Sequence, residues 1–513
     1  MLVTILLATA ICLATFWIVS HLRWKFQYFK RHGIPYAPGY FPLGSLIVWQ
    51  CFAGQKSLLE IPNYLFDSFP KSKVFGYFKC LGEPVLAIKD LELTKRIMVK
   101  DFDHFIDRNF LKIHPEANKY MRNMLMNIKG DHWKSIRNLL TPMFTASKMK
   151  TIMPFLNANA DRLSSHLSTR LHEANIDVKD VYQRFTIEVL GNLGCGVEGN
   201  VIEGQENVFY KKAMILSGSA APPVLGVLKF VFSMMFPDTA YDLKIDPFDS
   251  NTYKFFETVV LTSVKNRAKS HVRRNDFLDL MLDTIKELGE KEEDFSYIQN
   301  QDDVNDFIVT NAIMLFFVGN DTTSGAIALT ILNLALHQEV QEKLYNEIMD
   351  TIEQNEGNVN LDYEQLNSMS YLGKVIKESI RLWGLNFFDR TCTKDYYIPE
   401  LNFTVPKGMH VNIAGGKIMR DSENFLNPDA FDPDQHFEDH YVPPNFIAFG
   451  HGPRQCIGMR LAFILTRTAL VHTLYHFKVV PSPKTTKNWF WNPIVPGGLD
   501  LNSAFVKFQK REI

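Results

Sequence analysis

The sequence FGHGPRQCIG, residues 449–458, decides the fold, and it surrounds one cysteine, Cys456, with three glycines and an arginine. The nearest other cysteine in the chain is Cys392. Glycine permits a positive φ angle and lets the backbone approach a flat group closely. A long apolar segment begins at Gly458 and predicts a helix, whose N-terminus, together with the charge of Arg454, lowers the pKa of the thiol. The stretch therefore predicts a thiolate at position 456.

A thiolate in such a loop can be a nucleophile or a metal ligand. A nucleophile needs a base held beside it, and the one local candidate, His451, lies in a flexible glycine-rich loop. A haem needs only one such ligand from the protein, because the porphyrin supplies four other donors to the iron. An inert, buried cysteine at the start of a helix is the remaining alternative. The six cysteines form no C-x-x-C motif and no zinc-like spacing with histidine, which favours a reducing compartment.

The overall composition is that of a globular protein with a large core. The chain has 513 residues, of which 46% are hydrophobic and 22% charged, and its formal net charge is −1. No low-complexity tract or internal repeat divides residues 46–513, which we expect to form one catalytic domain. The near-neutral charge gives no electrostatic support for binding nucleic acid, and none is expected.

The N-terminus predicts a membrane anchor. Residues 1–20 carry no charged side chain and are long enough to cross a bilayer as a helix, and basic residues follow between 23 and 31. Basic residues after the span predict that the rest of the chain stays in the cytosol. Residues 21–45 contain three prolines after His32 and predict a stiff hinge between the anchor and the domain.

Most of the domain is predicted to be helical, with a small β portion. Strand-like pieces occur at 73–88 and 402–413. The polar residues 319–325 divide a long apolar segment, and a core helix interrupted at that point is favoured over a second membrane span. Helical periodicity predicts helices over 87–100, 131–145, 178–195, 252–288, 302–336, 338–355, 366–382 and 458–476.

The cysteine stretch resembles the F-x-x-G-x-R-x-C-x-G signature of the cytochrome P-450 family. Four further segments resemble that family in the same order along the chain. They are GDHWKSIRNLLTPMF (130–144), VGNDTTS (318–324), KESIRLW (377–383) and FDPDQHF (431–437). The resemblance covers essentially the whole chain and implies the P-450 fold preceded by an N-terminal transmembrane helix. The segments DHFIDRN (103–109), LTPMFTASKMK (140–150) and 390–408 are most similar to the animal microsomal branch, which includes detoxifying and steroid-oxidising members.

The resemblance implies haem b (iron protoporphyrin) as the cofactor, with Cys456 as the axial thiolate ligand. It implies that Asp321 delivers protons from solvent and that Thr322 passes them to the dioxygen that is activated. From the residues alone, a turn or cap between two helices is the favoured interpretation of these two residues. The remaining cofactor-binding residues implied are Trp133, Arg137, Arg390 and Arg454 at the propionates, and Phe449 and Gly458 in the cysteine loop.

Glu378 and Arg381 lie three residues apart, and so share one face of a predicted helix. Most such pairs are solvated surface bridges of small value, whereas the resemblance implies a buried structural pair. Trp133 and Arg137 lie four residues apart, and a packed indole beside an exposed arginine is their ordinary interpretation.

The chain departs from the family pattern at three places. Val318 stands where a small residue is usual, and its side chain is expected to narrow the site. His436 stands where an arginine usually completes a triad with the E-x-x-R pair, so the histidine either replaces it in part or the third partner is lost. After Arg381 the usual Leu-Tyr-Pro is replaced by residues 382–384.

Several apolar segments are candidate walls for a substrate, although by periodicity alone they are ordinary core residues. The candidates are Phe316, Phe317, Phe387, Phe388 and residues 227–236, and the last of these is also a candidate to enter the membrane.

Together these features predict a monooxygenase in the endoplasmic reticulum membrane that inserts one oxygen atom into a lipophilic small molecule. The expected partners are an NADPH-dependent flavoprotein reductase and, as a second electron donor, cytochrome b5. Three alternatives remain open: an isomerase or dehydratase that rearranges a peroxide without a reductase, a non-catalytic haem sensor, and a cysteine-nucleophile enzyme without haem.

Overall fold

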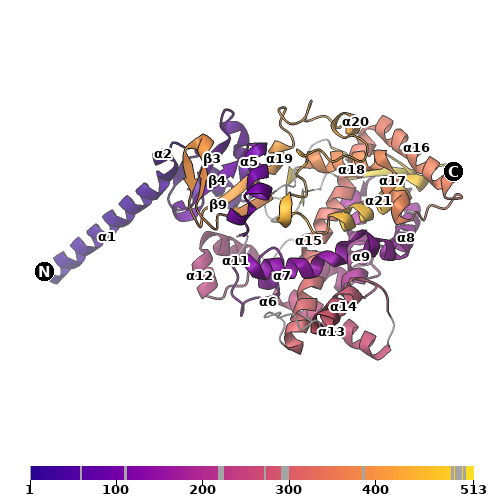
Figure 1. Ribbon diagram of the computed structural model, residues 1–513, viewed down its shortest axis with the longest axis horizontal. Coiled ribbons are helices and arrows are strands. Elements are labelled where there is room, and N and C mark those ends of the chain that lie inside the picture. Colours follow the sequence, from indigo (N-terminus) through magenta and orange to yellow (C-terminus); the bar gives the residue numbers. More distant parts are fainter. Residues whose placement is uncertain are drawn as a thin grey trace.

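One long helix, α15 (Gln301–Leu336), occupies the centre of the molecule, and the computed structural model places most other helices around it (Figure 1). Its residues 307–318 are apolar on nearly every face, so this part is stable in water only when protein encloses it. Most of its residues are buried, and it packs mainly against α9 (Val178–Leu190) and α18 (Ser370–Trp383). The structure describes residues 2–57, 60–108, 112–217, 224–270, 273–290, 300–383, 387–486, 490–491, 499–500 and 504–512.

The remaining helices fall into long and short ones. The longer ones are α1 (Leu2–Phe26), α7 (Gly130–Leu140), α8 (Ala146–Thr169), α10 (Val208–Leu216), α11 (Val224–Met235), α13 (Ser250–Ser270), α14 (Phe277–Glu290), α16 (Gln338–Gln354) and α21 (Met459–His476). The short ones are α2 (Tyr28–Arg31), α3 (Leu46–Phe52), α4 (Ile61–Leu65), α5 (Leu91–Lys95), α6 (Lys119–Asn123), α12 (Pro237–Asp242), α17 (Tyr363–Ser368), α19 (Gly415–Ile418) and α20 (Pro433–His436).

The largest sheet has the strand order β3–β4–β9–β6. In it, β3 (Val74–Phe78) pairs antiparallel with β4 (Pro84–Ile88), β4 pairs parallel with β9 (His410–Ala414), and β9 pairs antiparallel with β6 (Phe387–Thr391). The smaller sheets are β10 (Phe477–Pro481) with β13 (Phe505–Lys510) and β5 (Ile176–Asp177), β1 (Gly39–Tyr40) with β2 (Gly44–Ser45), β7 (Tyr396–Ile398) with β8 (Phe403–Val405), and β11 (Phe490–Trp491) with β12 (Leu499–Asp500). The prediction of a mainly helical domain with a small β portion is confirmed.

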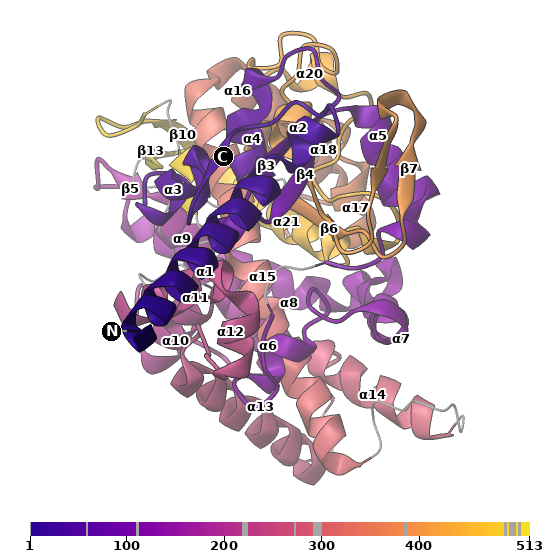
Figure 2. The same ribbon diagram turned by 90° about the vertical axis from the view of Figure 1, so that its left-hand side faces the viewer.

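The N-terminal helix α1 projects from the body of the protein (Figure 1), and in the view turned by 90° it lies in front of the body (Figure 2). Residues 3–26 have a mean hydropathy of 2.2 at their most apolar, and protein covers none of that window. An uncovered apolar helix of this length is typical of a membrane span. The helix runs to Phe26, past the predicted boundary at residue 20. By contrast, α15 also has the length of a span, but most of it is buried inside the protein.

Part of the predicted hinge, residues 21–45, is bound to the domain rather than free. The backbone of Ala37 donates to Gly76 O, and Gly76 N donates to Pro35 O, both at 2.8 Å. Tyr36 pairs with Gly76 as an isolated parallel bridge. The proline-rich segment therefore extends the large sheet beyond β3, which fixes where the chain leaves the domain toward α1.

The predicted interruption of the central helix is wrong, because α15 is continuous through residues 319–325. Polar side chains in a buried helix need partners, and these find them without opening the backbone. Asn320 bonds Thr186 at 2.5 Å and Ser217 at 3.1 Å, and the hydroxyl of Thr322 donates to the carbonyl of Val318 at 2.7 Å.

Other predicted helices differ from those of the structure at their boundaries. The segment 252–288 is not one helix but two, because the chain turns between α13 and α14 at Asn275, whose φ is 55°. Arg267 holds this turn by pairing with Asp276 and Asp279, each at 2.5 Å. The helix expected from residue 87 begins only at Leu91, after strand β4. The whole of α8 was absent from the prediction, because Pro154 and buried asparagines interrupt its apolar stripe.

Candidate active site

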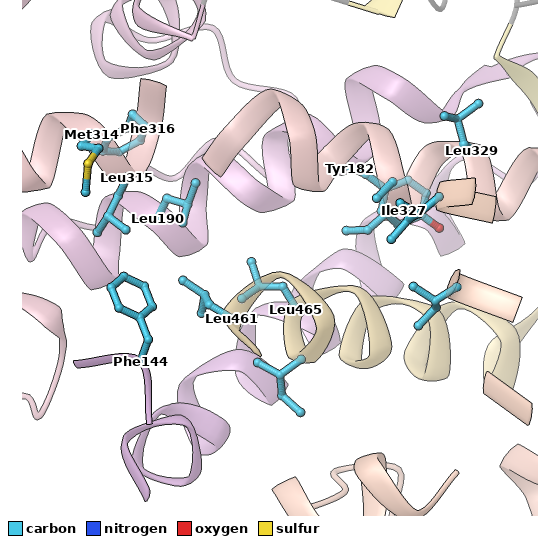
Figure 3. Packing of buried hydrophobic residues seen from close by; sticks show 14 of the residues in the cluster. Phe144, Tyr182, Leu190, Met314, Leu315, Phe316, Ile327, Leu329, Leu461 and Leu465 are labelled. Carbon is cyan, nitrogen blue, oxygen red and sulfur yellow. The ribbon is translucent and has the colours of Figure 1, made fainter. Parts of the chain in front are cut away.

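Cys456 lies on the wall of a cavity of about 380 Å³ between α15, α18, α21, α7 and strand β6. Most of the wall is apolar. Figure 3 shows three of the lining side chains, Leu315, Phe144 and Leu461, which reach the same space from three different elements. The polar part of the wall consists mainly of arginines and threonines, which are described below. An apolar cavity with a few placed polar groups is the usual form of a small-molecule site.

The backbone of the cysteine loop is fixed by its own hydrogen bonds. Cys456 N donates to Phe449 O at 2.8 Å, and Gln455 N donates to Gly452 O at 3.0 Å. The expected positive φ angles are present at Gly450 (72°) and Gly452 (70°). A Cβ at Gly452 would lie 2.1 Å from the carbonyl oxygen of Met98, so this glycine is required by contact with protein and not by a ligand.

Gly458 has a different role from the other two glycines. It is the N-cap of α21 and lines the cavity, and a Cβ there would have no neighbour closer than Phe144 at 4.0 Å. The expectation that all three glycines make room for a flat cofactor is therefore wrong, because only Gly458 borders the cavity. Phe449 also lines it and packs against Phe463 with ring centroids 5.2 Å apart.

The thiol of Cys456 is exposed, and its exposed surface faces the cavity. Burial of the loop raises the pKa of this thiol and outweighs the backbone N–H of Gly458 and the charges of Arg137 and Arg108, which lower it. The net pKa is therefore raised, and the prediction that the loop lowers it is wrong. The cations that act on the thiol are Arg137 and Arg108 rather than the predicted Arg454. The helix N-terminus acts as expected, through the amide of Gly458.

Arg454 is buried and is fully engaged with the protein on three sides. Its Nε, Nη1 and Nη2 donate to the carbonyl oxygens of Ile106, Leu125 and Ile128 at 2.9, 3.1 and 3.1 Å. Its guanidinium carbon lies 3.9 Å from the ring centroid of Trp133. Burial, with Arg108 and Arg390 nearby, lowers the pKa of Arg454 to about 8. Arg454 and Trp133 both line the cavity and together join the cysteine loop to residues 106–133.

Two other arginines, Arg390 and Arg108, have buried guanidinium nitrogens without hydrogen-bond partners among the described residues. Arg390 is 1% exposed and donates through Nη1 to Asp389 O, but its buried Nε and Nη2 have no hydrogen-bond partner among the described residues. Arg108 donates through Nη2 to Arg454 O at 3.2 Å, and its buried Nε likewise lacks a partner there. Burial lowers the pKa of Arg390 to about 9 and also lowers that of Arg137.

These groups fit the cofactor that the sequence predicts. Arg390 and Phe388 lie two residues apart on β6, and so share the face of the strand that borders the cavity. Buried cations without partners are costly unless an anion completes the site. The two propionates of a haem would supply such anions beside Arg108, Arg137 and Arg390, and the apolar walls suit its porphyrin.

Thr322 lines the cavity, on the α15 side. Asp321, its neighbour, is buried against α9, where its carboxylate lies 2.5 Å from Lys179 Nζ. Lys179 also donates to Ser324 Oγ at 3.1 Å. Successive residues of a helix point about 100° apart, so the two predicted proton-delivery residues face different surroundings. Asp321 is not among the residues that line the cavity.

Glu378 and Arg381 form a buried ion pair on α18, with both side chains at 0% exposure. Arg381 also donates to the carbonyls of Met419, Pro428 and Ala430 at 2.9, 2.6 and 3.0 Å. The prediction of a buried structural pair, rather than a surface bridge, is confirmed. Of the two alternatives for His436, replacement of the third partner holds, since its Nδ1 lies 2.9 Å from Glu378.

Only some of the residues proposed as substrate walls line the cavity. Val318 lines the cavity and is 40% exposed to it, and Phe388 lines it as well. Phe316 does not: it is fully buried and packs against Phe209 and Phe256 with ring centroids 5.7 and 5.0 Å apart. Phe317 packs against Phe248. The side chain of Phe387 lies outside the described residues, as do residues 384–386.

Two residues of the site were missed by the sequence analysis. Arg108 lies in the segment DHFIDRN, which carried part of the resemblance but was used only for classification. The available signal was the charged pair Asp107-Arg108 directly after the apolar pair Phe105-Ile106. Lys179 gave no signal, because its contact with Asp321 joins helices that are far apart in the sequence.

Comparison with known proteins gives the same family. The sequence profile of the Cytochrome P450 family matches residues 38–495. Among curated relatives, a probable cytochrome P450 6d4 of Drosophila melanogaster is 29% identical over 493 residues, covering 93% of this chain and 92% of the relative. Cytochrome P450 9e2 of Blattella germanica is 30% identical over 516 residues, covering 93% and 94%. Cytochrome P450 6A1 of Musca domestica is 29% identical over 509 residues, covering 95% and 94%.

The chain belongs to the cytochrome P450 family. It is therefore a monooxygenase of the haem-thiolate class, an oxidoreductase whose cofactor is held by a cysteine thiolate. Membership also implies a redox partner that supplies electrons, and lipophilic substrates in general.

Proposed function

We propose that this protein is a monooxygenase of the endoplasmic reticulum membrane that inserts one oxygen atom from O₂ into a lipophilic small molecule. Its electrons come from NADPH through a flavoprotein reductase, with cytochrome b5 as a second donor. One observation carries the proposal: the thiol of Cys456 faces a largely apolar cavity that Arg108 and Arg137 also line, and buried nitrogens of Arg108 and of the nearby Arg390 lack hydrogen-bond partners among the described residues.

The proposed cofactor is haem b, with Cys456 as its axial ligand. The sequence has no C-x-x-C-H motif for covalent attachment, so non-covalent groups must retain the haem. Arg108, Arg137 and Arg390 hold the propionates, and Trp133 and Arg454 form the wall behind them. Phe449 and Gly458 border the cofactor on the cysteine side. When bound, the haem supplies the activation of dioxygen, which no protein side chain provides.

Thr322 and Asp321 hold and move the protons that this chemistry consumes. Thr322 presents its hydroxyl at the cavity wall, where it donates to Val318 O at rest. Asp321 is the acidic group next to it and is tied to Lys179, whose side chain is 12% exposed. Proton transfer from the surface to Thr322 therefore requires the Lys179–Asp321 ion pair to open, after which the carboxyl can exchange its proton with Thr322 or with a water.

The proposed organisation has three parts. Residues 1–20 span the membrane, residues 21–45 connect the span to the domain, and residues 46–513 form the cytosolic catalytic domain. The uncovered apolar surface of α1 supports the anchor. Helix α11 supports a second contact with lipid, because Leu225 and Leu228 are exposed to 63% and 60%. Such a contact would bring lipophilic compounds from the membrane to the domain.

The experiment that tests this function is turnover with purified reductase, NADPH and isotope-labelled dioxygen on a panel of lipophilic compounds. We expect at least one compound to gain one labelled oxygen atom, with the reaction dependent on both NADPH and reductase. A matched Cys456→Ser variant should consume NADPH without forming product.

Other outcomes would overturn the proposal in distinct ways. Conversion of an organic peroxide without reductase, and no labelled product with it, would indicate the isomerase or dehydratase alternative. Haem binding with no product from any compound under either condition would indicate a sensor. Product formation undiminished in Cys456→Ser would show that the thiolate is not required.

A further inference from the structure

Glu378 is a buried carboxylate that accepts hydrogen bonds from three different groups. Arg381 donates to both of its oxygens, from Nε at 2.7 Å and from Nη2 at 2.9 Å. The backbone N–H of Asp432 donates to Oε1 at 3.0 Å, and His436 Nδ1 lies 2.9 Å from the same oxygen. With this many donors the pKa of Glu378 is held below its usual value in spite of burial. The group is therefore an ionised acceptor.

The imidazole of His436 is placed between two groups that can only accept. Its Nδ1 faces the Glu378 carboxylate, and its Nε2 lies 2.5 Å from the carbonyl oxygen of Leu426. A neutral imidazole has one N–H and can satisfy only one of these acceptors, whereas an imidazolium donates to both. The geometry is therefore that of a protonated histidine.

The surroundings of His436 support the charged form. Its side chain is 2% exposed, and Phe425 packs edge-on against the ring at 5.7 Å. Among the described residues, the charged groups that act on it are Glu378, which favours the proton, and Arg381, which opposes it. The carboxylate of Asp432 is directed to Gln435 N instead. Burial lowers the pKa of His436, but the bonds to Glu378 and Leu426 outweigh it, and the net pKa is raised.

We propose that His436 is a positioning residue that acts as a cation, joining α18 to residues 419–432, and that this link weakens when the imidazole loses its proton. The haem-thiolate site of this chain is then more stable at neutral and mildly acidic pH than at alkaline pH. The inference rests on the proposed cofactor for one of its two readouts only.

The link reaches the site from two directions. Helix α18 carries Glu378 and also lines the cavity, through Ile376 and Ile380. The segment that follows His436 leads directly into the cysteine loop at 449, and Phe437 packs edge-on against Phe446 at 5.3 Å along the way. Loss of the link therefore frees the cavity wall and the approach to Cys456 together.

The sign of the pH dependence follows from linkage. A group with a raised pKa in the folded state stabilises the fold fully below its unfolded pKa, and the stabilisation is lost as pH rises through the folded pKa. Within that window, the unfolding equilibrium constant rises by at most about tenfold per pH unit. Lys377, on the same helix, has a pKa lowered to about 8 by burial and contributes with the opposite sign, so the comparison must be made between variants.

The test compares wild type with His436→Arg and His436→Gln in the full-length, haem-loaded protein. Two quantities are measured from pH 6 to pH 9: the urea midpoint of unfolding by circular dichroism, and the fraction of haem that gives the red-shifted Soret band of the reduced carbon monoxide complex. His172→Arg serves as the control, because His172 is an exposed histidine in a loop.

We expect the wild type and His172→Arg to lose stability and thiolate signal as pH rises from 6.5. His436→Arg should lose this dependence while keeping the stability of the wild type at low pH, because an arginine stays charged throughout. His436→Gln should be less stable at every pH. It should also lack the part of the pH dependence that His436 contributes. If His436→Arg and His436→Gln keep the same pH dependence as the wild type, the inference is wrong. The urea midpoint requires no turnover, so this result is independent of the proposed activity.

Discussion

Two buried arginines of this protein are equally hidden from solvent and differ in almost everything else. Arg381 is 0% exposed, and its guanidinium makes five hydrogen bonds, two to Glu378 and three to backbone carbonyls. Arg390 is 1% exposed and makes one, to its neighbour Asp389. A guanidinium has five N–H groups, so the protein saturates the first arginine and leaves most of the second unused.

The difference separates groups that serve the fold from groups that serve a ligand. A folded protein satisfies nearly all of its buried polar atoms, so an exception needs an explanation. The hydrogen bonds of Arg381 serve the fold, because they fix residues 419–430 on α18. For Arg390, with Arg108 beside it, we propose an anionic ligand in the cavity next to Cys456 that would complete these hydrogen bonds.

The largest expected effect comes from breaking the saturated cluster. Arg381→Met leaves Glu378 buried without its main partner, and removal of one member of such a pair costs about 3–5 kcal/mol. Urea unfolding should show this loss. The control is Arg420→Met, because Arg420 pairs with Asp429 at the surface, with side chains 41% and 76% exposed, where a pair contributes less than about 1 kcal/mol. Equal losses in the two variants would remove the distinction between a saturated core cluster and an ordinary ion pair.

Substitution of Arg390 should weaken haem binding without destabilising the haem-free protein. In Arg390→Met, the haem-free protein should be as stable as wild type or more so, because an unpaired buried cation has been removed. Haem affinity should fall about ten- to hundredfold, since hydrogen bonds to charged groups contribute roughly 1.5–3 kcal/mol. Haem titration and urea unfolding of the haem-free protein measure the two quantities.

The matched variant is Arg454→Met. Its guanidinium holds the carbonyls of Ile106, Leu125 and Ile128, so it belongs with Arg381, and its loss should destabilise the haem-free protein. If Arg390→Met is destabilised as strongly as Arg454→Met, the unpaired donors of Arg390 have no bearing on ligand binding.

Helix α15 offers a similar comparison between a residue at the cavity and one buried away from it. The two are threonines that make the same local hydrogen bond. Thr322 Oγ1 donates to Val318 O at 2.7 Å and faces the cavity, and Thr330 Oγ1 donates to Ala326 O at 2.7 Å and is fully buried elsewhere. General acid–base assistance contributes about 10²–10⁴-fold, and water entering in place of the hydroxyl recovers part of it. We therefore expect Thr322→Ala to lower product formed per NADPH about tenfold. Thr330→Ala should leave this ratio unchanged, and a similar fall in both variants would assign the effect to helix stability.

Val318 should give the smallest effect. Its side chain is apolar and exposed to the cavity, so Val318→Ala changes the shape of the wall without removing a hydrogen bond. One buried methylene is worth about 0.8 kcal/mol, or roughly fourfold in affinity. Spectral titration should show dissociation constants that shift by about this factor, upward for compounds that contact the valine and downward for bulkier ones. A uniform shift for all compounds would mean that the residue acts on the cofactor and not on the substrate.

The features of the site that depend on residues close together in the sequence could be predicted. The cysteine loop, the pairing of Glu378 with Arg381 and the start of α21 at Met459 all follow from residues within ten positions of one another. The long central helix also followed from its apolar length. These features are local, and local patterns are what a single sequence displays.

The parts that could not be predicted depend on contacts between distant segments. The orientation of Asp321 toward Lys179 is set by the packing of α9 on α15. The saturation of Arg454 by carbonyls at residues 106, 125 and 128 is set by how the chain before α7 wraps over the cysteine loop. The role of His436 is visible only once residues 419–432 lie on α18. In each case the residue type was known, and the partner was not.

The most direct test of the account is the absorption spectrum of the reduced, carbon monoxide-bound protein, measured for wild type and for Cys456→Ser at matched haem content. We predict a strongly red-shifted Soret band in the wild type, because an anionic sulfur ligand lies opposite the carbon monoxide. The band should be absent in Cys456→Ser, although Arg108, Arg137 and Arg390 still bind haem there. A wild-type spectrum without the red shift, or a red-shifted band that persists in Cys456→Ser, would contradict the assignment of Cys456 as the thiolate ligand.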